Sequence, residues 1–491
     1  MKLWKAAVAR LQQRLEGPGA IGYAKWVARH DTHSPRSLDV RLSRLKRRPL
    51  FSILLRAPGM GPQIYPDFEV CPAFDRATAL ESARGDFVIL LEDAELAPRA
   101  LLRLAEELEA HPDAVLIYSD EDRIDERGRR FEPAFKPDFS FELLRSQDFI
   151  GGVAAWRRSF VVDSGGLLEP YDLALRANAA QIRHVPEVLY HRRGPARSTS
   201  SRRVRYPLPE PAPLTSIIIP TRDRVELLRA CIESIQRHTT GYELLVVDNH
   251  STEPDALAYL DGLEKSKAAR VLRHPGPFNF SQLNNHAARE ARGELLAFVN
   301  NDIEVIDGEW LREMASHAVR PEVGAVGAKL LFPDGTVQHA GIITGLGTDR
   351  IAGTPHRGIP RDSPGYCGRA LAVQEFSAVT AACMVMRKQV FDEVGGFDEV
   401  NLPVSYNDVD LCLRLRELRY RVLWTPYAEL YHKESASRGS DRTPENRNRF
   451  AREVGYMRKR WGALLEMDPY FNPNLSLDSD AFLLATPPRS R

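Results

Sequence analysis

Cysteine is scarce in this chain of 491 residues, with five copies and no pair in CxxC spacing. An odd number without paired spacing argues against a disulfide framework or a zinc ribbon and favours a reducing, cytoplasmic location. No run approaches the ~18 apolar residues of a membrane-spanning helix, and residues 1–16 lack the apolar core of a signal peptide. Charge of one sign is not in excess either, since the net charge is +1. We therefore expect no nucleic-acid partner from overall charge.

The first residues form an amphipathic pattern. Apolar side chains of residues 3–15 fall near one helical face, with Lys2, Lys5, Arg10 and Arg14 elsewhere. Such a helix either packs on its own protein or attaches loosely to an anionic membrane surface. Peripheral contact with the inner face of a membrane is the second of these two expectations.

Two stretches poor in apolar residues divide the chain. Residues 34–49 are polar and basic, and residues 192–213 are rich in Arg, Ser and Pro, with repeated Pro-x-Pro steps. Such composition is typical of linkers and boundaries. We predict an N-terminal helical and basic segment over residues 1–49 and a C-terminal tail over residues 463–491. Between them we predict two α/β domains, over residues 50–193 and 214–462, joined by a linker over residues 194–213.

The second of these domains alternates between apolar strands and amphipathic helices. Strands are predicted at 216–219, 243–248, 269–272 and 295–299, with helices between them. This β-α-β-α order predicts a doubly wound, parallel α/β sheet. Ligands bind such sheets beyond the carboxyl ends of the strands. The polar clusters follow the strands there, at residues 221–223, 248–251 and 300–302.

The two α/β domains resemble each other. Residues 83–86 (Ala-Arg-Gly-Asp) match residues 291–294 (Ala-Arg-Gly-Glu), and three further motifs match in the same order. We therefore predict a duplicated fold with a degenerate first copy, which serves as a structural or acceptor-side domain.

The first copy is predicted to lack the acids of the second. At the offset of the Ala-Arg-Gly match Ala94 takes the place of Asp302, and in the separate match of Leu-x-Leu-Arg segments Pro170 takes the place of Asp408. The acidic run Asp120-Glu121-Asp122 is more readily explained as a solvated turn than as a metal site.

Sugar transfer from a nucleotide diphosphate needs two acidic groups. A divalent cation neutralises the leaving diphosphate and prefers hard oxygen ligands, and a second carboxylate takes a proton from the acceptor hydroxyl. Asp302, at the end of an apolar strand, is the predicted ligand for Mg²⁺ or Mn²⁺. Asp408 is the predicted base, with Asp410 as the helix cap. His432 is expected either to complete the metal shell or to contact the diphosphate.

Polar groups for a nucleotide stand at other strand and helix ends. Asp248 is placed to accept from a uracil or thymine ring or from a ribose hydroxyl. Asn284 and Asn285 open a helix, where anionic groups are favoured; the alternative is a buried Asn pair that holds loops together. Residues 341–368 are rich in glycine and are expected to form a lid or an acceptor loop.

These residues resemble family 2 glycosyltransferases of the GT-A fold. The resemblance covers residues 215–439 closely and residues 86–191 in weaker form. Six motifs in order carry it: Ile219-Pro220-Thr221-Arg222-Asp223, Val247-Asp248-Asn249-His250-Ser251, Phe278-Asn279-Phe280-Ser281-x-x-Asn284-Asn285, Asn300-Asn301-Asp302, Gly395-Gly396-Phe397-Asp398 and Asn407-Asp408-Val409-Asp410-Leu411. The implied fold is a Rossmann-like mixed sheet flanked by helices.

The resemblance also implies roles. The acidic metal motif falls on Asn300-Asn301-Asp302, a form similar to that of rhamnosyltransferase-like members, and the base motif falls on Asn407-Asp408. Nucleotide contacts carry over to Thr221, Asp223 and Asp248, and we expect Asn249, Asn284 and Asn301 to join them. The implied reaction is inverting transfer from a UDP- or dTDP-sugar to a hydroxyl of a cell-surface polysaccharide or lipid-linked saccharide, as in tandem-domain O-antigen enzymes.

Two other functions are compatible with parts of this pattern. A nucleotidyltransferase usually has a glycine-rich phosphate loop after its first strand, whereas residues 220–223 contain no glycine. A non-catalytic carbohydrate-binding scaffold suits the first copy, but the second copy keeps its acids.

Overall fold

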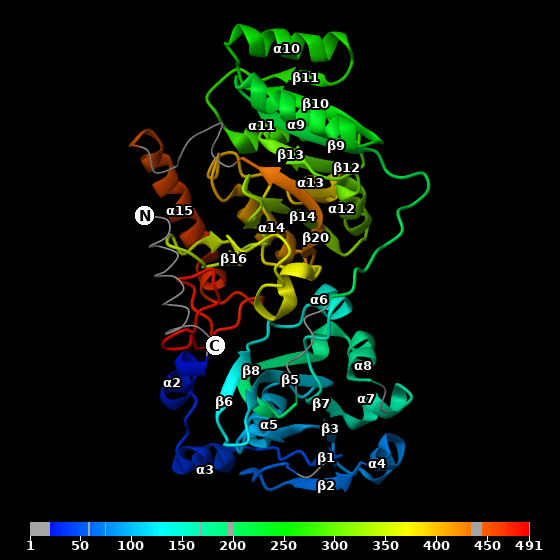
Figure 1. The fold of residues 1–491 in the computed structure, drawn as a ribbon, viewed down its shortest axis with the longest axis vertical. Coiled ribbons are helices and arrows are strands. Elements are labelled where there is room, and N and C mark those ends of the chain that lie inside the picture. The colour runs from blue at the N-terminus through cyan, green and yellow to red at the C-terminus, as the bar shows by residue number, and fades with distance from the viewer. Residues whose placement is uncertain are drawn as a thin grey trace. The chain divides into compact units, whose positions relative to one another are not determined.

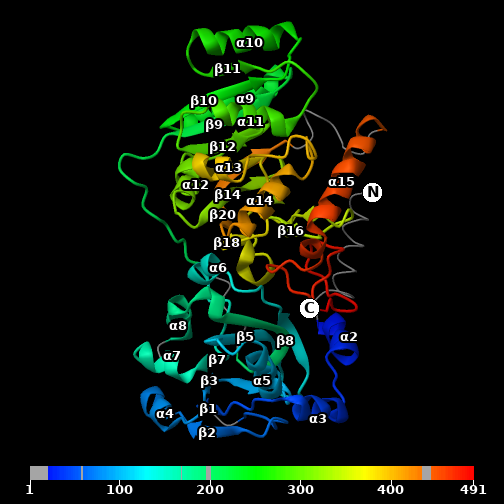
Figure 2. The same ribbon diagram turned by 180° about the vertical axis from the view of Figure 1, so that it is seen from behind.

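The computed structural model describes residues 20–56, 59–73, 75–166, 169–194, 201–433 and 444–490. It divides into two compact units, one of residues 1–200 with 469–491 and one of residues 201–468 (Figures 1 and 2). Residues 469–491, which were predicted as part of a separate tail, thus belong to the first unit. The predicted boundary at residue 462 lies inside the helix Pro444–Glu466. The amphipathic segment at residues 1–16 lies outside the described residues. Within the described ranges, no helix is long and apolar enough to cross a membrane.

The second unit is built on one mixed sheet with the strand order β11-β10-β9-β12-β19-β14-β20-β13. The strands span β9 (Thr215–Thr221), β10 (Tyr242–Asp248), β11 (Arg270–Arg273), β12 (Leu295–Val299), β13 (Ile303–Val305), β14 (Val323–Leu331), β15 (Val337–His339), β16 (Ile343–Thr344), β17 (Ala352–Gly353), β18 (Gln374–Glu375), β19 (Cys383–Arg387) and β20 (Arg421–His432). The strands from β9 to β12 are parallel, as predicted, whereas β19 runs antiparallel to β12 and β14.

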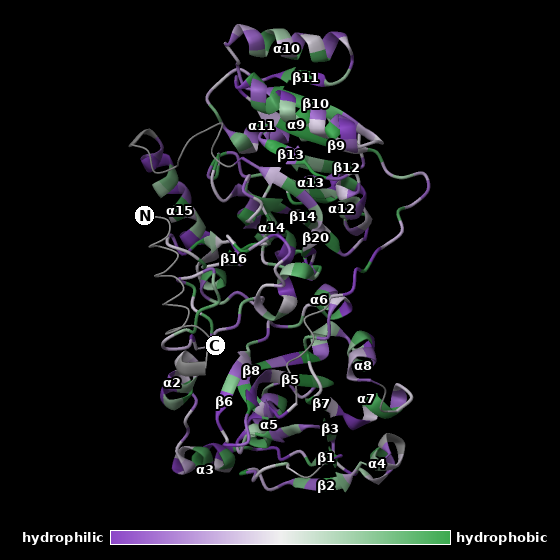
Figure 3. Cartoon of the chain, viewed as in Figure 1, coloured by the Kyte–Doolittle hydropathy of each residue, from purple (hydrophilic) through white to green (hydrophobic). Residues whose placement is uncertain are grey.

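The helices that flank this sheet are α9 (Val225–His238), α10 (Pro254–Lys265), α11 (Phe280–Glu290), α12 (Trp310–Ala318), α13 (Lys388–Glu393) and α14 (Asn407–Glu417), whereas α15 (Pro444–Glu466) contacts β16. Apolar residues line the strands and the helix faces against them (Figure 3). In α9, for example, Leu228, Cys231, Ile232 and Ile235 are buried at helical spacing and pack on Ile217 and Ile219. Burying one such aliphatic side chain stabilises the fold by about 1.5–3 kcal/mol. The predicted α/β class, a mixed sheet flanked by helices, is confirmed.

The first unit has a second sheet with the order β2-β1-β3-β7-β5-β8-β4. Its elements are α2 (Ala20–His30), α3 (Pro35–Arg44), β1 (Phe51–Leu55), β2 (Phe68–Pro72), α4 (Arg76–Ser82), β3 (Phe87–Leu91), β4 (Ala94–Leu96), α5 (Ala100–Ala110), β5 (Leu116–Ile124), β6 (Arg130–Ala134), α6 (Phe141–Ser146), β7 (Ala154–Arg157), α7 (Arg158–Asp163), α8 (Pro170–Arg176) and β8 (Ile182–Arg192). Strand for strand, this is the order β10-β9-β12-β19-β14-β20-β13 of the second unit, with the same parallel and antiparallel pairs. The described part of the first unit has no counterpart of β11.

The repeated Ala-Arg-Gly motif has one structural explanation in both units. A Cβ on Gly293 would lie 2.6 Å from the backbone nitrogen of Ser216, and a Cβ on Gly85 would lie 2.7 Å from that of Ser52. Each glycine N–H donates to the hydroxyl of that serine at 2.8 Å. Only glycine fits this close approach of two chain segments, and such agreement in detail is what a duplication would produce.

The acidic run of the first unit is not a solvated turn. Asp120, Glu121 and Asp122 lie in β5 and are at most 2% exposed. The polarity of the run itself predicted a turn. Carboxylates can be buried where charged and polar groups bond to them, and here those groups come from distant parts of the sequence. Among the described residues, no group of three or more His, Cys, Asp or Glu is arranged to hold a metal ion.

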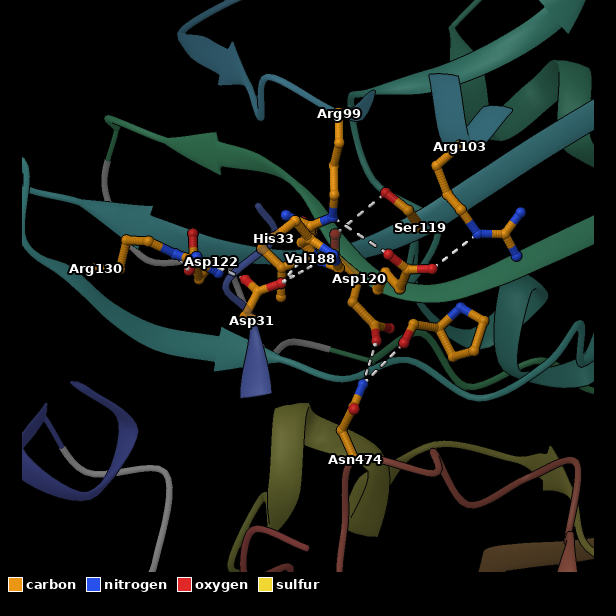
Figure 4. A network of polar contacts seen from close by, with 12 residues as sticks. Asp31, His33, Arg99, Arg103, Ser119, Asp120, Asp122, Arg130, Val188 and Asn474 are labelled. Atoms are coloured by element: carbon orange, nitrogen blue, oxygen red, sulfur yellow. Dashed lines mark hydrogen bonds and ion pairs between the residues drawn. The ribbon is translucent and has the colours of Figure 1, made fainter. Parts of the chain in front are cut away.

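The partners of this run join the two ends of the first unit. Asp122 accepts from the hydroxyl of Tyr23 on α2 at 2.7 Å, and Asp120 accepts from the amide of Asn472 at 2.9 Å. Figure 4 shows the network, with Asn474 reaching Asp120. The run therefore anchors both the N-terminal helix and the C-terminal segment to the sheet.

Candidate active site

The predicted metal ligand and the predicted base are linked through one turn of backbone. The N–H of Asn300, which follows β12, donates to the carbonyl of Ala382 at 3.0 Å. The N–H of the preceding residue, Ala381, donates to Oδ2 of Asp408 at 3.1 Å. Asp302 follows Asn300 by two residues, so Asp302 and Asp408 lie at the same edge of the sheet. Parallel strands β9, β10 and β12 all end at this edge.

Asp302 and His432 face each other. Oδ1 of Asp302 lies 3.2 Å from Nε2 of His432, because Ile303 and His432 are register partners in the β13–β20 pair. Asp302 is 4% exposed, and its buried Oδ1 makes no hydrogen bond within the described part of the chain. A buried carboxylate oxygen without a hydrogen-bond partner costs free energy unless a cation meets it. One carboxylate and one imidazole nitrogen are a donor set that fits a divalent metal completed by phosphate oxygens.

The far side of the His432 ring is held by Gln338 of β15. Oε1 of Gln338 lies 2.6 Å from Nδ1 of His432. The amide nitrogen of Gln338 donates to the backbone carbonyl of His432 at 3.2 Å. Sequence reasoning missed this residue; the signal for it is a polar side chain that is fully buried within the short strand β15.

Asp408 sits at the start of α14 and is half-buried. Besides the Ala381 contact, Oδ1 accepts from the N–H of Val409 at 2.8 Å. Desolvation raises the pKa of Asp408, and the hydrogen bonds from Ala381 and Val409 only partly oppose that rise. A raised pKa brings a carboxylate closer to the pH at which it exchanges protons, which suits a general base.

Asp410 is not a helix cap, contrary to the prediction. The residue before α14 is Tyr406, with φ of 61°, and no side chain caps the helix. Asp410 is fully buried and accepts from Nε1 of Trp461 at 2.9 Å and from Nε of Arg414 at 2.8 Å. Because Trp461 lies on α15, Asp410 fixes α15 against the helix that carries Asp408.

The residues predicted to bind the nucleotide follow β9, β10 and β12. The amide of Asn301 donates to the hydroxyl of Thr221 at 3.1 Å, which joins the ends of β9 and β12. Asp223 accepts from two backbone N–H groups of the 252–253 segment. Asp248 is paired with Arg273 at 3.0 Å. These side chains therefore line one edge, and the two carboxylates also stabilise its loops.

Two of the predicted amides keep an open acceptor. The Oδ1 atoms of Asn249 and Asn284 are buried and have no hydrogen-bond partner in the described ranges. The amide nitrogen of Asn249 is bound to the carbonyls of His274 and Gly276, and that of Asn284 to the carbonyl of Phe280. Asn285, by contrast, bonds both backbone groups of Phe397 at 2.9 Å, which is the loop-holding role.

The segment predicted as a lid or an acceptor loop is tied down along its length. Thr344 donates from its hydroxyl to Leu464 at 2.7 Å and from its backbone to Asp468 at 2.7 Å. Ile351 and His356 are buried. These contacts are typical of a fixed wall rather than of a mobile lid.

The first unit keeps one acid that the constant offset concealed. Asp93 directly precedes β4, as Asp302 directly precedes β13. The backbone carbonyl of Asp93 accepts from the N–H of Arg193 at 3.0 Å, and the carbonyl of Asp302 accepts from the N–H of Lys433 at 3.1 Å. One extra residue after β12 shifts the match from Ala94 to Asp93, so the prediction of Ala94 is wrong. The Asp93 side chain is exposed rather than buried. Pro170, the first residue of α8, still stands where Asp408 opens α14.

The sequence matches one protein family and is similar to several known proteins. Residues 216–395 match the family described as Glycosyl transferase family 2. The uncharacterized protein y4gI of Sinorhizobium fredii is 42% identical over 84% of this chain and 50% of its own length. The O-antigen biosynthesis protein RfbC of Myxococcus xanthus is 35% identical over 94% of this chain and 43% of its own. The chain thus spans about half the length of the curated relatives it matches.

Solved structures share less of the sequence. A crystal structure of GalNAc-T7 with UDP, GalNAc and Mn²⁺ is 14% identical, covers 50% of this chain and 48% of that one, and has a TM-score of 0.40. The mannosyltransferase PcManGT of Pyrobaculum calidifontis, in complex with GDP-Man and Mn²⁺, is 17% identical over 53% of this chain and 67% of that one, with a TM-score of 0.37.

Proposed function

We propose that residues 216–395, which match the model of glycosyl transferase family 2, transfer a sugar from a nucleotide-diphosphate donor to a saccharide hydroxyl with inversion of the anomeric carbon. The observation that carries the proposal is the pair Asp302 and His432, whose facing donor atoms lie at the sheet edge that also holds Asp408. The name of the Myxococcus relative favours a cell-surface polysaccharide or its lipid-linked precursor as the acceptor.

Asp302 and His432 would hold Mg²⁺ or Mn²⁺ together with the donor phosphates. When bound, the cation neutralises the charge that develops on the leaving diphosphate. Oδ1 of Asp302 supplies the charged ligand and Nε2 of His432 the neutral one. Because Asn300 and Asn301 are uncharged, Asp302 is the carboxylate of this strand end that meets the cation.

Asp408 would accept the proton of the acceptor hydroxyl as the new glycosidic bond forms. Inversion requires attack from the face opposite the leaving diphosphate, so the base and the metal ligands must belong to one cleft but to different elements. Asp408 belongs to α14, whereas Asp302 and His432 belong to the β13–β20 pair. Asp408 is half-buried rather than fully enclosed, which would leave the acceptor a way to reach the base.

The nucleotide would lie along the ends of β9 and β10. Thr221, Asp223 and Asp248 would bind the base and ribose, and the open Oδ1 acceptors of Asn249 and Asn284 would receive hydrogen bonds from donor hydroxyl or ring N–H groups. Asn301 would position Thr221. Such a set is compatible with a UDP- or dTDP-sugar, since both rings present an N–H and ribose or deoxyribose presents hydroxyls.

The test is turnover of a panel of UDP- and dTDP-sugars with Mn²⁺ or Mg²⁺. We expect the wild type to release the nucleoside diphosphate only with metal, Asp302→Ala to lose both nucleotide binding and turnover, and Asp408→Asn to bind the nucleotide with turnover lowered about 10²–10⁴-fold. Asp255→Asn, an exposed carboxylate on α10, is the matched control and should behave as the wild type. Metal-independent turnover, or full turnover by Asp408→Asn, would refute the proposal.

A further inference from the structure

We propose that the adjacent residues Gln338 and His339 of β15 are positioning residues, Gln338 for the metal-binding nitrogen of His432 and His339 for the base Asp408. The inference rests on the proposed function, since it concerns the same two catalytic groups. Sequence reasoning assigned no role to either residue.

Both side chains are buried and polar, and both use their hydrogen-bonding groups. Gln338 is 4% and His339 is 3% exposed. Because successive side chains of a strand point to opposite faces, the two neighbours reach different parts of the site. Burying polar groups is costly unless they are bonded, and here the bonds lead to His432 on one face and to the turn at Thr380 on the other.

Gln338 selects which nitrogen of His432 carries the proton. Its amide nitrogen donates to the carbonyl of His432 at 3.2 Å, so its Oε1 must be the atom that lies 2.6 Å from Nδ1. An amide oxygen only accepts, hence Nδ1 is the protonated nitrogen. The lone pair of the neutral ring then remains on Nε2, which lies 3.2 Å from Oδ1 of Asp302 and 3.4 Å from the amide nitrogen of Asn300. Two acceptors face each other there, as metal ligands do.

His339 uses both ring nitrogens in the neutral form. Its Nδ1 donates to the carbonyl of Ala328 at 3.0 Å, and its Nε2 accepts from the N–H of Thr380 at 3.3 Å. A protonated ring would direct an N–H at the N–H of Thr380. Burial lowers the pKa of His339 to about 4, which keeps this arrangement at neutral pH.

The turn held by His339 is the one that binds the base. Ala381, the next residue after Thr380, donates its N–H to Oδ2 of Asp408 at 3.1 Å. The side chain of Thr380 makes a further hydrogen bond to Asp408. Displacement of Thr380 would therefore change the orientation and the solvation of the Asp408 carboxylate without touching Asp302.

The two residues should separate in a double comparison. Gln338→Leu removes both bonds to His432, so we expect the Mn²⁺ concentration for half-maximal turnover to rise about 10–100-fold, with kcat at saturating Mn²⁺ largely kept. Gln338→Glu keeps an acceptor for Nδ1 and should rescue much of the loss.

His339→Asn keeps the donor to Ala328 but loses the acceptor for Thr380. We therefore expect kcat to fall at least tenfold, with the ~10²–10⁴-fold effect of losing a general base as the upper limit, while the Mn²⁺ requirement stays unchanged. His339→Gln, which restores an acceptor at the position of Nε2, should recover most of kcat.

A readout independent of turnover is the side-chain ¹⁵N spectrum of His432 in the metal-free protein, assigned by its loss in His432→Gln. The wild type should show the Nδ1–H form, and Gln338→Leu should show a mixture. Equal effects of the Gln338 and His339 variants on Mn²⁺ requirement and kcat, or an Nε2–H form in the wild type, would overturn the inference even if the enzyme is active. Absence of turnover with every donor, with the Nδ1–H form present, would instead count against the proposed function and leave the Gln338 part supported.

Discussion

Oδ1 of Asp302 lies 3.2 Å from Nε2 of His432, and the contact lacks the geometry of a hydrogen bond. Gln338 occupies Nδ1 from the other side of the ring, which leaves Nε2 as the nitrogen beside Asp302. We propose that the pair shares a cation, and several consequences of this proposal and of the fold can be measured.

Metal binding should stabilise the second unit. A ligand at 100 times its dissociation constant adds about 2.7 kcal/mol to the free energy of unfolding, which corresponds to several degrees for a unit of this size. We expect Mn²⁺ with UDP to raise the melting temperature of the wild type and of Asp255→Asn, measured by differential scanning fluorimetry, but not that of Asp302→Asn. An equal rise in Asp302→Asn would place the metal elsewhere.

The rate of transfer should have an acidic limb set by Asp408. Desolvation raises the pKa of this carboxyl above its ordinary value of 3.8, and only the ionised form accepts a proton. The rate should thus fall as the pH drops through a pKa above 3.8, as measured by the pH profile of kcat. Residual turnover by Asp408→Asn should lack this limb. A limb that persists unchanged in the variant would assign it to another group.

The contact of Asp410 with Trp461 should matter for stability rather than for chemistry. Trp461→Phe keeps an aromatic ring but removes the N–H that donates to Asp410 at 2.9 Å. Loss of a partner from a buried charged group costs about 1–3 kcal/mol, which urea unfolding would measure. Nucleotide affinity should stay within twofold of the wild type, and a selective loss of affinity would show that Asp410 has a direct role.

The first unit should lose stability as the pH rises. His184 lies between Asp120 and Asp138, each 3.0 Å from one ring nitrogen. Burial opposes its charge, but the two carboxylates outweigh burial and raise the pKa above 6.5. A raised histidine pKa contributes stability that is complete below the unfolded value and is lost as the pH rises through the folded value.

Unfolding of the chain between pH 6 and pH 9 tests this. The first unit of the wild type should become less stable with rising pH, and His184→Gln should be less stable at pH 6 and have a flatter profile. A wild-type first unit that gains stability over this range would contradict the assignment.

The strand-end residues of the site could be predicted from the sequence. Asp302 follows a strand of five buried apolar residues, and the carboxyl edge of such a strand is where ligands bind. The same reasoning placed Thr221 and Asp248, because their strands are short and apolar. Periodicity and polarity are local signals, so they identify residues whose place depends on their own strand.

The remainder depends on partners that are distant in the sequence. Asp120 is buried because His184 and Asn472 reach it, and no local pattern carries that information. Gln338 reaches His432 only through the pairing of β15 with β14 and of β14 with β20. The match of Asp302 to Ala94 failed because a single inserted residue is invisible to a constant offset, whereas strand pairing reveals it.

The central claim is that Asp302 and His432 hold a divalent cation that binds the diphosphate of the donor. Isothermal titration of UDP and dTDP into the protein, with Mn²⁺ and with EDTA, tests this most directly. The account predicts binding of at least one nucleotide that requires Mn²⁺ and that is lost in both Asp302→Ala and His432→Ala. Equal binding in EDTA, or undiminished Mn²⁺-dependent binding by both variants, would contradict it.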